Sequence, residues 1–262
     1  MKILFVGDIF GKVGRRALKN SLPNMVAMMK ADFVIANCEN LAGGFGFTKD
    51  ILGEVYAAGV EAVTTGNHVW DKKEALEIVK ADQKILRPAN YPAEAPGKGS
   101  AVFTAKNGAK VGVLNLMGRV FMDALDCPFH RADQELEKLR QETNIILVDM
   151  HAEASSEKMA MGYYLDGRVS AVIGTHTHIQ TADEKILPRG TGYITDAGMT
   201  GPSHSIIGVR VDIILKRFLQ KLPERFEEAH GAGQLNAVLV EIDDVTGTTR
   251  AIKRIQTADA AV

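Results

Sequence analysis

The sequence predicts an α/β protein of one domain, residues 1–262, in which helices cover two packed mixed sheets. Three observations predict this class. Short apolar strands alternate with helical segments in the first third of the chain, an Asn-Gly pair separates two strand-like segments in the middle, and the alternation then resumes. Alternation indicates parallel strands joined by helical crossovers, whereas Asn-Gly between strands indicates an antiparallel hairpin. Together these patterns predict mixed sheets.

The first third of the chain has the order strand, helix, strand, helix, strand. The expected strands are residues 2–6, 33–36 and 60–64, and the expected helices are residues 13–30 and 49–58. Pro23 lies inside the first helix, where its missing N–H predicts a break or kink. Thr48 directly precedes the second helix and is expected to cap its N-terminus. This order implies parallel pairing with right-handed crossovers.

A turn-rich segment, residues 87–100, contains three prolines and ends the first alternation. Strand-like residues 101–105 and 110–116 then flank Asn107-Gly108, which predicts a hairpin with a two-residue turn. The rest of the chain resumes the alternation. Its expected helices are residues 132–141, 156–165 and 211–219, and its expected strands are residues 144–148, 169–173, 192–195, 236–242 and 249–255.

The composition is that of an ordinary globular protein and excludes several classes. Hydrophobic residues make up 46% and charged residues 24% of the chain. The net charge of −1 provides no basic surface for long nucleic acid. No apolar run approaches the roughly 18 residues that a membrane span needs, and no secretory leader pattern begins the chain. Cys38 and Cys127 are the two cysteines, and we expect free thiols in a reducing cytoplasm.

Polar side chains follow five of the expected strands at their carboxyl ends, which is the edge where α/β proteins bind ligands. They are Asp8, Asn37, Glu39, Asn40, Asn67, His68, Asp149, His151, His176 and His178. Each alone could be a turn residue or a helix cap. His176 and His178 are separated by one residue, and in an extended backbone such residues face the same side. Two imidazoles on one face suggest a metal site, or otherwise a polar surface patch.

The types of donor distinguish between metals. The candidate ligands offer carboxylate, amide and imidazole donors and no thiolate, which suits Fe, Mn, Zn or Co and excludes an Fe–S cluster. They are Asp8, Glu39, Asn67, His151, His176 and His178. These donors exceed what one tetrahedral ion uses. Two ions about 3.5–4 Å apart would use them, and such pairs serve phosphoester displacement.

Two other motifs do not lead to a function. The glycines of residues 7–14 match neither G-x-G-x-x-G nor G-x-x-x-x-G-K-[ST]. His151-Ala152-Glu153 resembles the H-x-E of zinc deaminases, but the downstream P-C-x-x-C that this chemistry needs does not occur. We therefore expect neither a nucleotide-binding loop nor a deaminase.

Four motifs, taken in chain order, carry a resemblance to a known family. They are Gly7-Asp8 with Gly11, Ala36-Asn37-Cys38-Glu39-Asn40, Gly66-Asn67-His68-Val69-Trp70-Asp71 and Gly174-Thr175-His176-Thr177-His178. Together they resemble the calcineurin-like metallophosphoesterases, and most of all the YmdB-type branch of 2′,3′-cyclic-nucleotide 2′-phosphodiesterases. Phe10 replaces a histidine of most superfamily members, and Cys38-Glu39 replaces their Gly-Asp. The branch shares both changes, and the resemblance covers nearly the whole chain.

The resemblance implies a four-layer αββα sandwich with a dinuclear metal centre. One metal is expected on Asp8, Glu39, Asn40 and His178. Glu39 would bridge to a second metal, and that metal's other ligands are expected to be Asn67, His151 and His176. Iron is the expected metal, with manganese or zinc as alternatives. His68 would be the general acid, and Trp70 and Asp71 are expected to orient it.

The implied reaction opens a nucleoside 2′,3′-cyclic phosphate to the 3′-nucleotide, by attack of a metal-bridging hydroxide on phosphorus. Two alternatives stay open, a nucleotide-sensing regulatory protein with slow hydrolysis and a broad-specificity phosphomonoesterase. We expect a small nucleotide substrate, no long nucleic acid, no membrane partner, and a cytoplasmic homo-oligomer.

Overall fold

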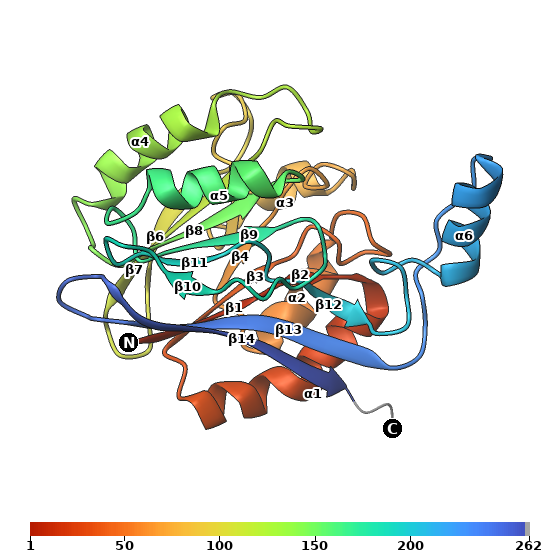
Figure 1. Cartoon of the computed structure of the whole chain (residues 1–262), viewed down its shortest axis with the longest axis horizontal. Coiled ribbons are helices and arrows are strands. Elements are labelled where there is room, and N and C mark those ends of the chain that lie inside the picture. Colours follow the sequence, from red (N-terminus) through yellow and green to blue (C-terminus); the bar gives the residue numbers. More distant parts are fainter. Residues whose placement is uncertain (260–262) are drawn as a thin grey trace.

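Two mixed sheets lie face to face, and helices cover their outer surfaces (Figure 1). The computed structural model describes residues 1–259, so residues 260–262 of the expected domain lie outside the described part. The predicted four-layer αββα arrangement is confirmed. Among the described residues, no helix is long and apolar enough to cross a bilayer.

The first sheet has eight strands in the order β2-β12-β13-β1-β3-β4-β5, with β14 beside β13. Their bounds are β1 Lys2–Val6, β2 Asp8–Ile9, β3 Phe33–Asn37, β4 Ala62–Thr64, β5 Ile85–Leu86, β12 Met199–Pro202, β13 Gly233–Ile242 and β14 Thr249–Asp259. The strands β1, β3, β4 and β5 are parallel, as the alternation predicts. The C-terminal strand β13 pairs antiparallel with β1 in the middle of the sheet, which makes the sheet mixed.

The second sheet has six strands in the order β10-β11-β9-β8-β7-β6. Their bounds are β6 Ser100–Thr104, β7 Lys110–Met117, β8 Ile146–His151, β9 Ala171–Thr175, β10 Lys185–Ile186 and β11 Gly192–Ile194. The four central strands are parallel, and the edge strands β6 and β10 pair antiparallel with their neighbours. Both sheets therefore present the carboxyl ends of parallel strands.

The helices divide between the two outer faces. On the first sheet lie α1 Gly11–Met29, α2 Lys49–Ala57 and α3 Ala75–Ala81, and on the second lie α4 Pro128–Leu139 and α5 Ser155–Tyr164. The sixth helix, α6 Val211–Gln220, projects away from both sheets (Figure 1). Thr48 caps α2 as predicted, because its hydroxyl accepts from the Ile51 N–H at 3.4 Å.

The central strands are buried on both faces, which explains their continuous apolar runs. In β1, Leu4 and Val6 face the layer of α1, whereas Ile3 and Phe5 face the second sheet. This follows from the two-residue period of a strand. Burial of each such side chain contributes about 1.5–3 kcal/mol relative to exposure.

Of the break or kink expected at Pro23, the break does not occur, because α1 continues through this residue. Proline removes one helical hydrogen bond, the one that Lys19 would accept. Both residues are exposed, so water can hydrate the freed carbonyl group.

The predicted two-residue turn at Asn107-Gly108 is also wrong. The Ala105 N–H donates to the Ala109 carbonyl at 2.9 Å, so the hairpin encloses the three residues 106–108. Gly108 has φ +85°, the left-handed conformation that three-residue hairpin loops need. The antiparallel pairing of β6 and β7 is confirmed.

The sequence did not predict four short strands, β2, β5, β10 and β12, or the seven-residue helix α3. Periodicity needs a longer segment than two to four residues to become visible. These strands form because tertiary neighbours supply their hydrogen-bond partners, as Asp8 and Met199 do for β2 and β12.

Candidate metal centre

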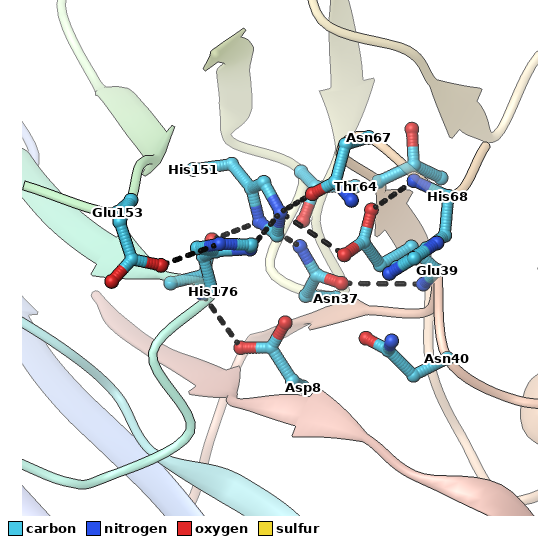
Figure 2. A network of polar contacts seen from close by, with 12 residues as sticks. Asp8, Asn37, Glu39, Asn40, Thr64, Asn67, His68, His151, Glu153 and His176 are labelled. Atoms are coloured by element: carbon cyan, nitrogen blue, oxygen red, sulfur yellow. Dashed lines mark hydrogen bonds and ion pairs between the residues drawn. The ribbon is translucent and has the colours of Figure 1, made fainter. Parts of the chain in front are cut away.

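Side chains from both sheets meet at one edge of the sandwich, where the parallel strands end (Figure 2). The residues are Asp8 after β1, Glu39 and Asn40 after β3, Asn67 and His68 after β4, His151 at the end of β8, and His176 and His178 after β9. Every residue that the sequence suggested for the site therefore lies at this edge. They fall into two groups of donors, with His68 beside them.

The first group consists of Asp8, Asn40 and His178. Asp8 Oδ1 and Asn40 Oδ1 are buried and have no hydrogen-bond partner among the described residues. Asp8 Oδ1 lies 3.8 Å from His178 Nε2. A buried polar atom without a partner costs about 1–3 kcal/mol. A cation among these atoms would remove that cost, so the donor set fits a metal ion.

The second group surrounds His151 Nε2. Glu39 Oε1 and Asn67 Oδ1 each lie 3.0 Å from this nitrogen, and His176 Nδ1 lies 3.1 Å from it. One ring proton cannot satisfy three acceptors. Donor atoms that bind one ion at about 2.0–2.2 Å lie about 3 Å or somewhat more apart, and the ligand atoms of Glu39, His151 and His176 all lie within 4.8 Å of one another. Glu39, His151 and His176 could therefore hold a metal ion.

The pKa shifts of the site also indicate that a positive charge is favourable among these side chains. Burial raises the pKa of Asp8 more than the positive charge of His178 lowers it. Burial also favours neutral Glu39, but the charge and hydrogen bond of His151 bring the pKa of Glu39 down to about 2. The pKa of His151 is raised to about 9, because the Glu39 carboxylate outweighs burial. Protonated His151 thus supplies the positive charge that the buried carboxylates require.

A buried carboxylate behind His151 orients its ring. His151 Nδ1 lies 2.9 Å from Thr175 Oγ1, which donates to Asp149 Oδ1 at 2.6 Å. The other oxygen of Asp149 accepts from Thr64 Oγ1 and from Asn37 Nδ2. Burial raises the pKa of Asp149 to about 6. The network leaves His151 Nε2 free to face the donor group, an arrangement that metal-binding histidines commonly have.

The expectation that His176 and His178 share one face of an extended strand is wrong. β9 ends at Thr175, and the two histidines have left-handed φ angles of 95° and 64°. Their rings therefore diverge, so that His176 meets His151 and His178 meets Asp8. Positive φ is unfavourable for residues other than glycine, so surrounding contacts must hold this loop.

Thr177, between the two histidines, anchors the loop to the interior. Asp196 Oδ2 accepts from Thr177 N at 3.1 Å and from Thr177 Oγ1 at 2.6 Å. Lys158 Nζ lies 2.7 Å from the same oxygen, and the Lys158 and Asp196 side chains are almost completely buried. This buried ion pair fixes the backbone that carries both histidines.

His68 lies beside the donors but points in a different direction from Asn67. Its backbone N–H donates to Glu39 Oε2 at 2.9 Å, which fixes its place next to the second group. Its Nδ1 lies 2.7 Å from Asp71 Oδ2, and the Phe45 ring packs edge-on at 5.1 Å. The expected orienting contact from Asp71 is therefore present.

The expected contact from Trp70 does not occur. The Trp70 ring packs against Tyr91 at 5.9 Å instead of His68.

With this geometry established, comparison with known proteins identifies the family. The family model described as "YmdB-like protein" matches residues 4–255. The chain belongs to the YmdB-like family. This is a family of metallophosphoesterases, so the chain is an enzyme of the metallophosphoesterase type, as its motifs predict.

Individual relatives match nearly the whole length of this YmdB-like chain. The 2′,3′-cyclic-nucleotide 2′-phosphodiesterase of Bacillus subtilis is 47% identical over 255 residues, which cover 97% of this chain and 96% of the relative. A crystal structure of a hypothetical protein from Thermus thermophilus has a TM-score of 0.93 and 42% identity, covering 99% of this chain and 100% of that one. A crystal structure of a novel phosphatase from Mycoplasma pneumoniae has a TM-score of 0.92 and 35% identity, covering 98% and 93%. The calcineurin-like fold is therefore shown.

The phenylalanine at position 10, where the resemblance to the wider superfamily leads one to expect a histidine, has a structural explanation in this YmdB-like chain. Phe10 offers no donor and instead packs edge-on against the His178 ring at 5.7 Å. Asn40 brings an unpaired amide oxygen into the same group. In place of a histidine at position 10, the site thus has an apolar ring that packs against His178 and an additional amide oxygen from Asn40.

Several residues of the YmdB-like site were not assigned a role from the sequence. Asp149 lies two residues before His151 on β8, and this spacing could have indicated that both face the same side. Gly66 is required because a Cβ there would lie 2.2 Å from His151 Nε2 and 2.5 Å from Glu39 Oε2. Glu153 lies 3.1 Å from His176 Nε2, although its motif suggested only a rejected deaminase.

The two cysteines are free thiols. Cys38 is fully buried in the apolar layer beneath α1, and burial raises the pKa of its thiol far above the ordinary value. A thiol that stays protonated is a poor nucleophile. Cys38 is therefore a packing residue of this YmdB-like chain.

Proposed function

We propose that this protein is a dinuclear metal-dependent phosphodiesterase that hydrolyses nucleoside 2′,3′-cyclic phosphates to 3′-nucleotides. The observation that carries the proposal is the pair of donor groups with Glu39 beside both. The donors of the two groups are carboxylate and amide oxygens and imidazole nitrogens, which suit two transition-metal ions. The substrate class is taken from the name of the Bacillus subtilis relative, which is 47% identical to this chain.

The two donor groups suggest how the ligands are shared. Asp8, Asn40 and His178 would hold one ion, and their two unpaired oxygens support this assignment. Asn67, His151 and His176 would hold the other, in the cluster around His151 Nε2. Glu39 would bridge them, since its negative charge acts on both Asp8 and His151. Iron is our first candidate metal, followed by manganese and zinc.

The metal ions would supply, when bound, positive charge for the phosphoryl oxygens and a pKa of water lowered towards about 7. The chain itself provides the proton for the leaving group. Asp71 accepts the proton of His68 Nδ1, so a His68 ring that carries protons on both nitrogens would donate the Nε2 proton to the departing ribose oxygen. Phe45 limits rotation of the His68 ring from one side.

Metal analysis paired with a substrate panel tests the proposal. Protein purified without chelator should contain two transition-metal ions per chain and should open 2′,3′-cyclic nucleotides with multiple turnovers. One tightly bound ion per chain in a saturated sample would contradict the dinuclear assignment. Product analysis should find the 3′-nucleotide, and a 2′-nucleotide product would contradict the assigned bond cleavage.

The same panel distinguishes the two other candidate functions. Faster turnover of p-nitrophenyl phosphate than of cyclic nucleotides would favour the broad phosphomonoesterase, which the name of the Mycoplasma pneumoniae structure keeps in consideration. Tight nucleotide binding with negligible single-turnover hydrolysis would favour a regulatory nucleotide sensor.

We also propose that the chain forms a homo-oligomer through α6. Leu215, Phe218 and Leu219 are exposed along this helix, and the apolar stripe continues to Leu222. A helix of ten residues is marginal in water without a packing partner. A second copy presents the same stripe, so a symmetric helix pair would bury both.

We also propose that the protein is located in the cytoplasm. The free thiols of Cys38 and Cys127 support a reducing compartment. Fractionation of the producing cells tests it, and recovery of the protein outside the cytoplasm would contradict it.

A further inference from the structure

Glu153 contacts the outer side of a candidate metal ligand. The Glu153 Oε2 atom lies 3.1 Å from His176 Nε2, while His176 Nδ1 faces His151 Nε2 at 3.1 Å on the opposite side of the ring (Figure 2). The ring is thus held between the donor cluster and an acceptor. Its two nitrogens have different partners, and those partners determine which nitrogen carries the proton.

The chemistry of imidazole fixes the direction of this contact. A histidine that binds a metal does so through a nitrogen without a proton, and its proton lies on the other nitrogen. The carboxylate of Glu153 can only accept, so it stabilises the form with the proton on Nε2. In that form the lone pair of Nδ1 points into the donor cluster.

We propose that Glu153 is a positioning residue, which holds His176 with its proton on Nε2 and its Nδ1 directed at the second metal site. The inference rests on the proposed metal centre and adds to it a residue outside the expected ligand set. It also gives a role to the His151-Ala152-Glu153 motif, which deaminase chemistry does not explain.

The acceptors of the three histidines differ in exposure. His151 Nδ1 contacts Thr175 Oγ1, which donates to the fully buried Asp149. His178 Nδ1 lies 2.9 Å from the backbone carbonyl oxygen of Ile207. The acceptor of His176 is a carboxylate whose side chain is 49% exposed. Of these three contacts, the one at His176 is therefore the easiest to remove without disturbing the interior.

The backbone of His176 is anchored through the neighbouring Thr177, but its own hydrogen bond does little to direct the ring. Its φ of 95° is unfavourable, and its N–H donates to Asp8 Oδ2 at the long distance of 3.3 Å. The Glu153 contact therefore matters for the direction of the ring. Loss of such an outer contact typically lowers metal affinity about 10- to 100-fold, and exposure of Glu153 favours the lower end.

Titration of the metal-free full-length chain with Zn²⁺, in competition with a chromophoric chelator, tests the inference. Glu153→Ala should weaken one of the two sites about tenfold and leave the other unchanged. Glu153→Gln should restore part of the affinity, because its amide oxygen accepts the same proton without the charge. Glu137→Ala is the matched control, since Glu137 is an exposed glutamate on α4, and it should bind like the wild type.

A spectroscopic measurement separates positioning from a general structural role. In the zinc-loaded wild type, ¹⁵N NMR of the His176 ring should show a metal-bound Nδ1 and a protonated Nε2. In Glu153→Ala, the Nε2 proton should exchange faster with water, while the metal-free variant should unfold at the wild-type temperature. Unchanged zinc affinity at both sites, or equal losses at both sites with a less stable metal-free chain, would overturn the inference.

Failure of the inference can be distinguished from failure of the metal centre. A wild type that binds two Zn²⁺ ions, with a metal-bound His176 in all variants and unchanged affinities, keeps the proposed function and removes the role of Glu153. A wild type whose His176 nitrogens do not respond to Zn²⁺ contradicts the metal centre itself, and the inference with it.

Discussion

His151 Nε2 has more acceptors around it than one proton can serve, and this crowding is the main chemical fact of the site at the scale of residues. Such an arrangement is costly unless a positive charge occupies the centre. Protonated His151 provides part of that charge. A metal ion would provide the charge instead, and His151 Nε2 would then need no proton. Two predictions address the residues involved.

Glu39→Gln should lower metal occupancy at both sites. The amide keeps the size of the side chain but removes the negative charge that acts on both groups of donors. Asn67→Ala should mainly affect one site, because the Asn67 oxygen contacts only the cluster around His151. Elemental analysis of saturated samples gives the stoichiometry. Full occupancy of both sites in Glu39→Gln would contradict a bridging role.

His68→Ala should keep both metals and lower kcat about 10²- to 10⁴-fold, the usual contribution of a general acid. The reason is geometric, since the side chain contacts Asp71 and Phe45 while Asn67 faces the donors. The loss should shrink for bis-p-nitrophenyl phosphate, whose leaving group hardly needs a proton. Steady-state kinetics on both substrates, with metal analysis of the variant, check this.

Two results would count against His68 as the acid. Equal losses of kcat on the natural and the activated substrate would contradict proton donation. Loss of metal from the variant would make His68 a ligand instead.

At the scale of elements, the loop after β9 shows how packing holds an unfavourable backbone. His176 and His178 have positive φ angles, and the buried pair of Lys158 and Asp196 fixes Thr177 between them. α5 provides the lysine, and the segment between β11 and β12 provides the aspartate. Two segments distant in the sequence therefore converge on one loop, which keeps two candidate ligands in place.

Asp196→Ala should lower the free energy of unfolding of the metal-free chain by about 3–5 kcal/mol, because it leaves the buried Lys158 ammonium without a carboxylate partner. Urea unfolding followed by circular dichroism measures this. Glu142→Ala is a suitable control, since it removes a carboxylate that pairs with a lysine at an exposed position. A loss as small as that of the control would show that the buried pair does not hold the loop.

At the scale of the whole molecule, the site joins the two sheets. The first sheet supplies the carboxylates and amides, and the second supplies the three histidines. Metal ions bound between them should therefore stabilise the sandwich as a whole. The apolar layer between the sheets, with residues such as Phe5 and Ile173, is the other connection.

Removal of metal with a chelator should lower the melting temperature of the wild type. Each site that binds only the native state adds about 2.7 kcal/mol when the free metal concentration is about 100 times Kd. Differential scanning calorimetry with and without chelator measures the shift. Glu39→Gln should show a smaller shift, and an unchanged wild-type melting temperature would contradict metal binding between the sheets.

Replacement of both Phe218 and Leu219 by serine should dissociate the oligomer and leave the fold intact. Both side chains are exposed on the projecting helix α6, so their loss removes contact area and not core (Figure 1). Sedimentation velocity gives the molecular mass, and Val245→Ser, at an exposed position of the β13–β14 turn, is the control. A monomeric wild type at micromolar concentration would refute self-association through α6.

The sequence by itself determined the fold class and the order of most elements. Apolar periodicity and turn residues are local signals, so they located β1, α1, β3, the β6–β7 hairpin and the strands β8, β9 and β11 of the second sheet. Motif order identified the family for the same reason, because each motif is a short run of neighbouring residues. The polar strand ends also marked the edge where the site lies.

Only the tertiary structure decided how those strand ends meet. The backbone turns at His176 and His178, which send the two rings to different donors, depend on Lys158 and Asp196 from distant parts of the chain. The contacts of Glu153 with His176 likewise follow from the left-handed turn of the loop and not from spacing along the chain. A local sequence pattern indicates which face of its own helix or strand a residue occupies. The site, however, is made of five strand ends, and packing between elements fixes how these ends meet. No single segment of the sequence encodes that packing.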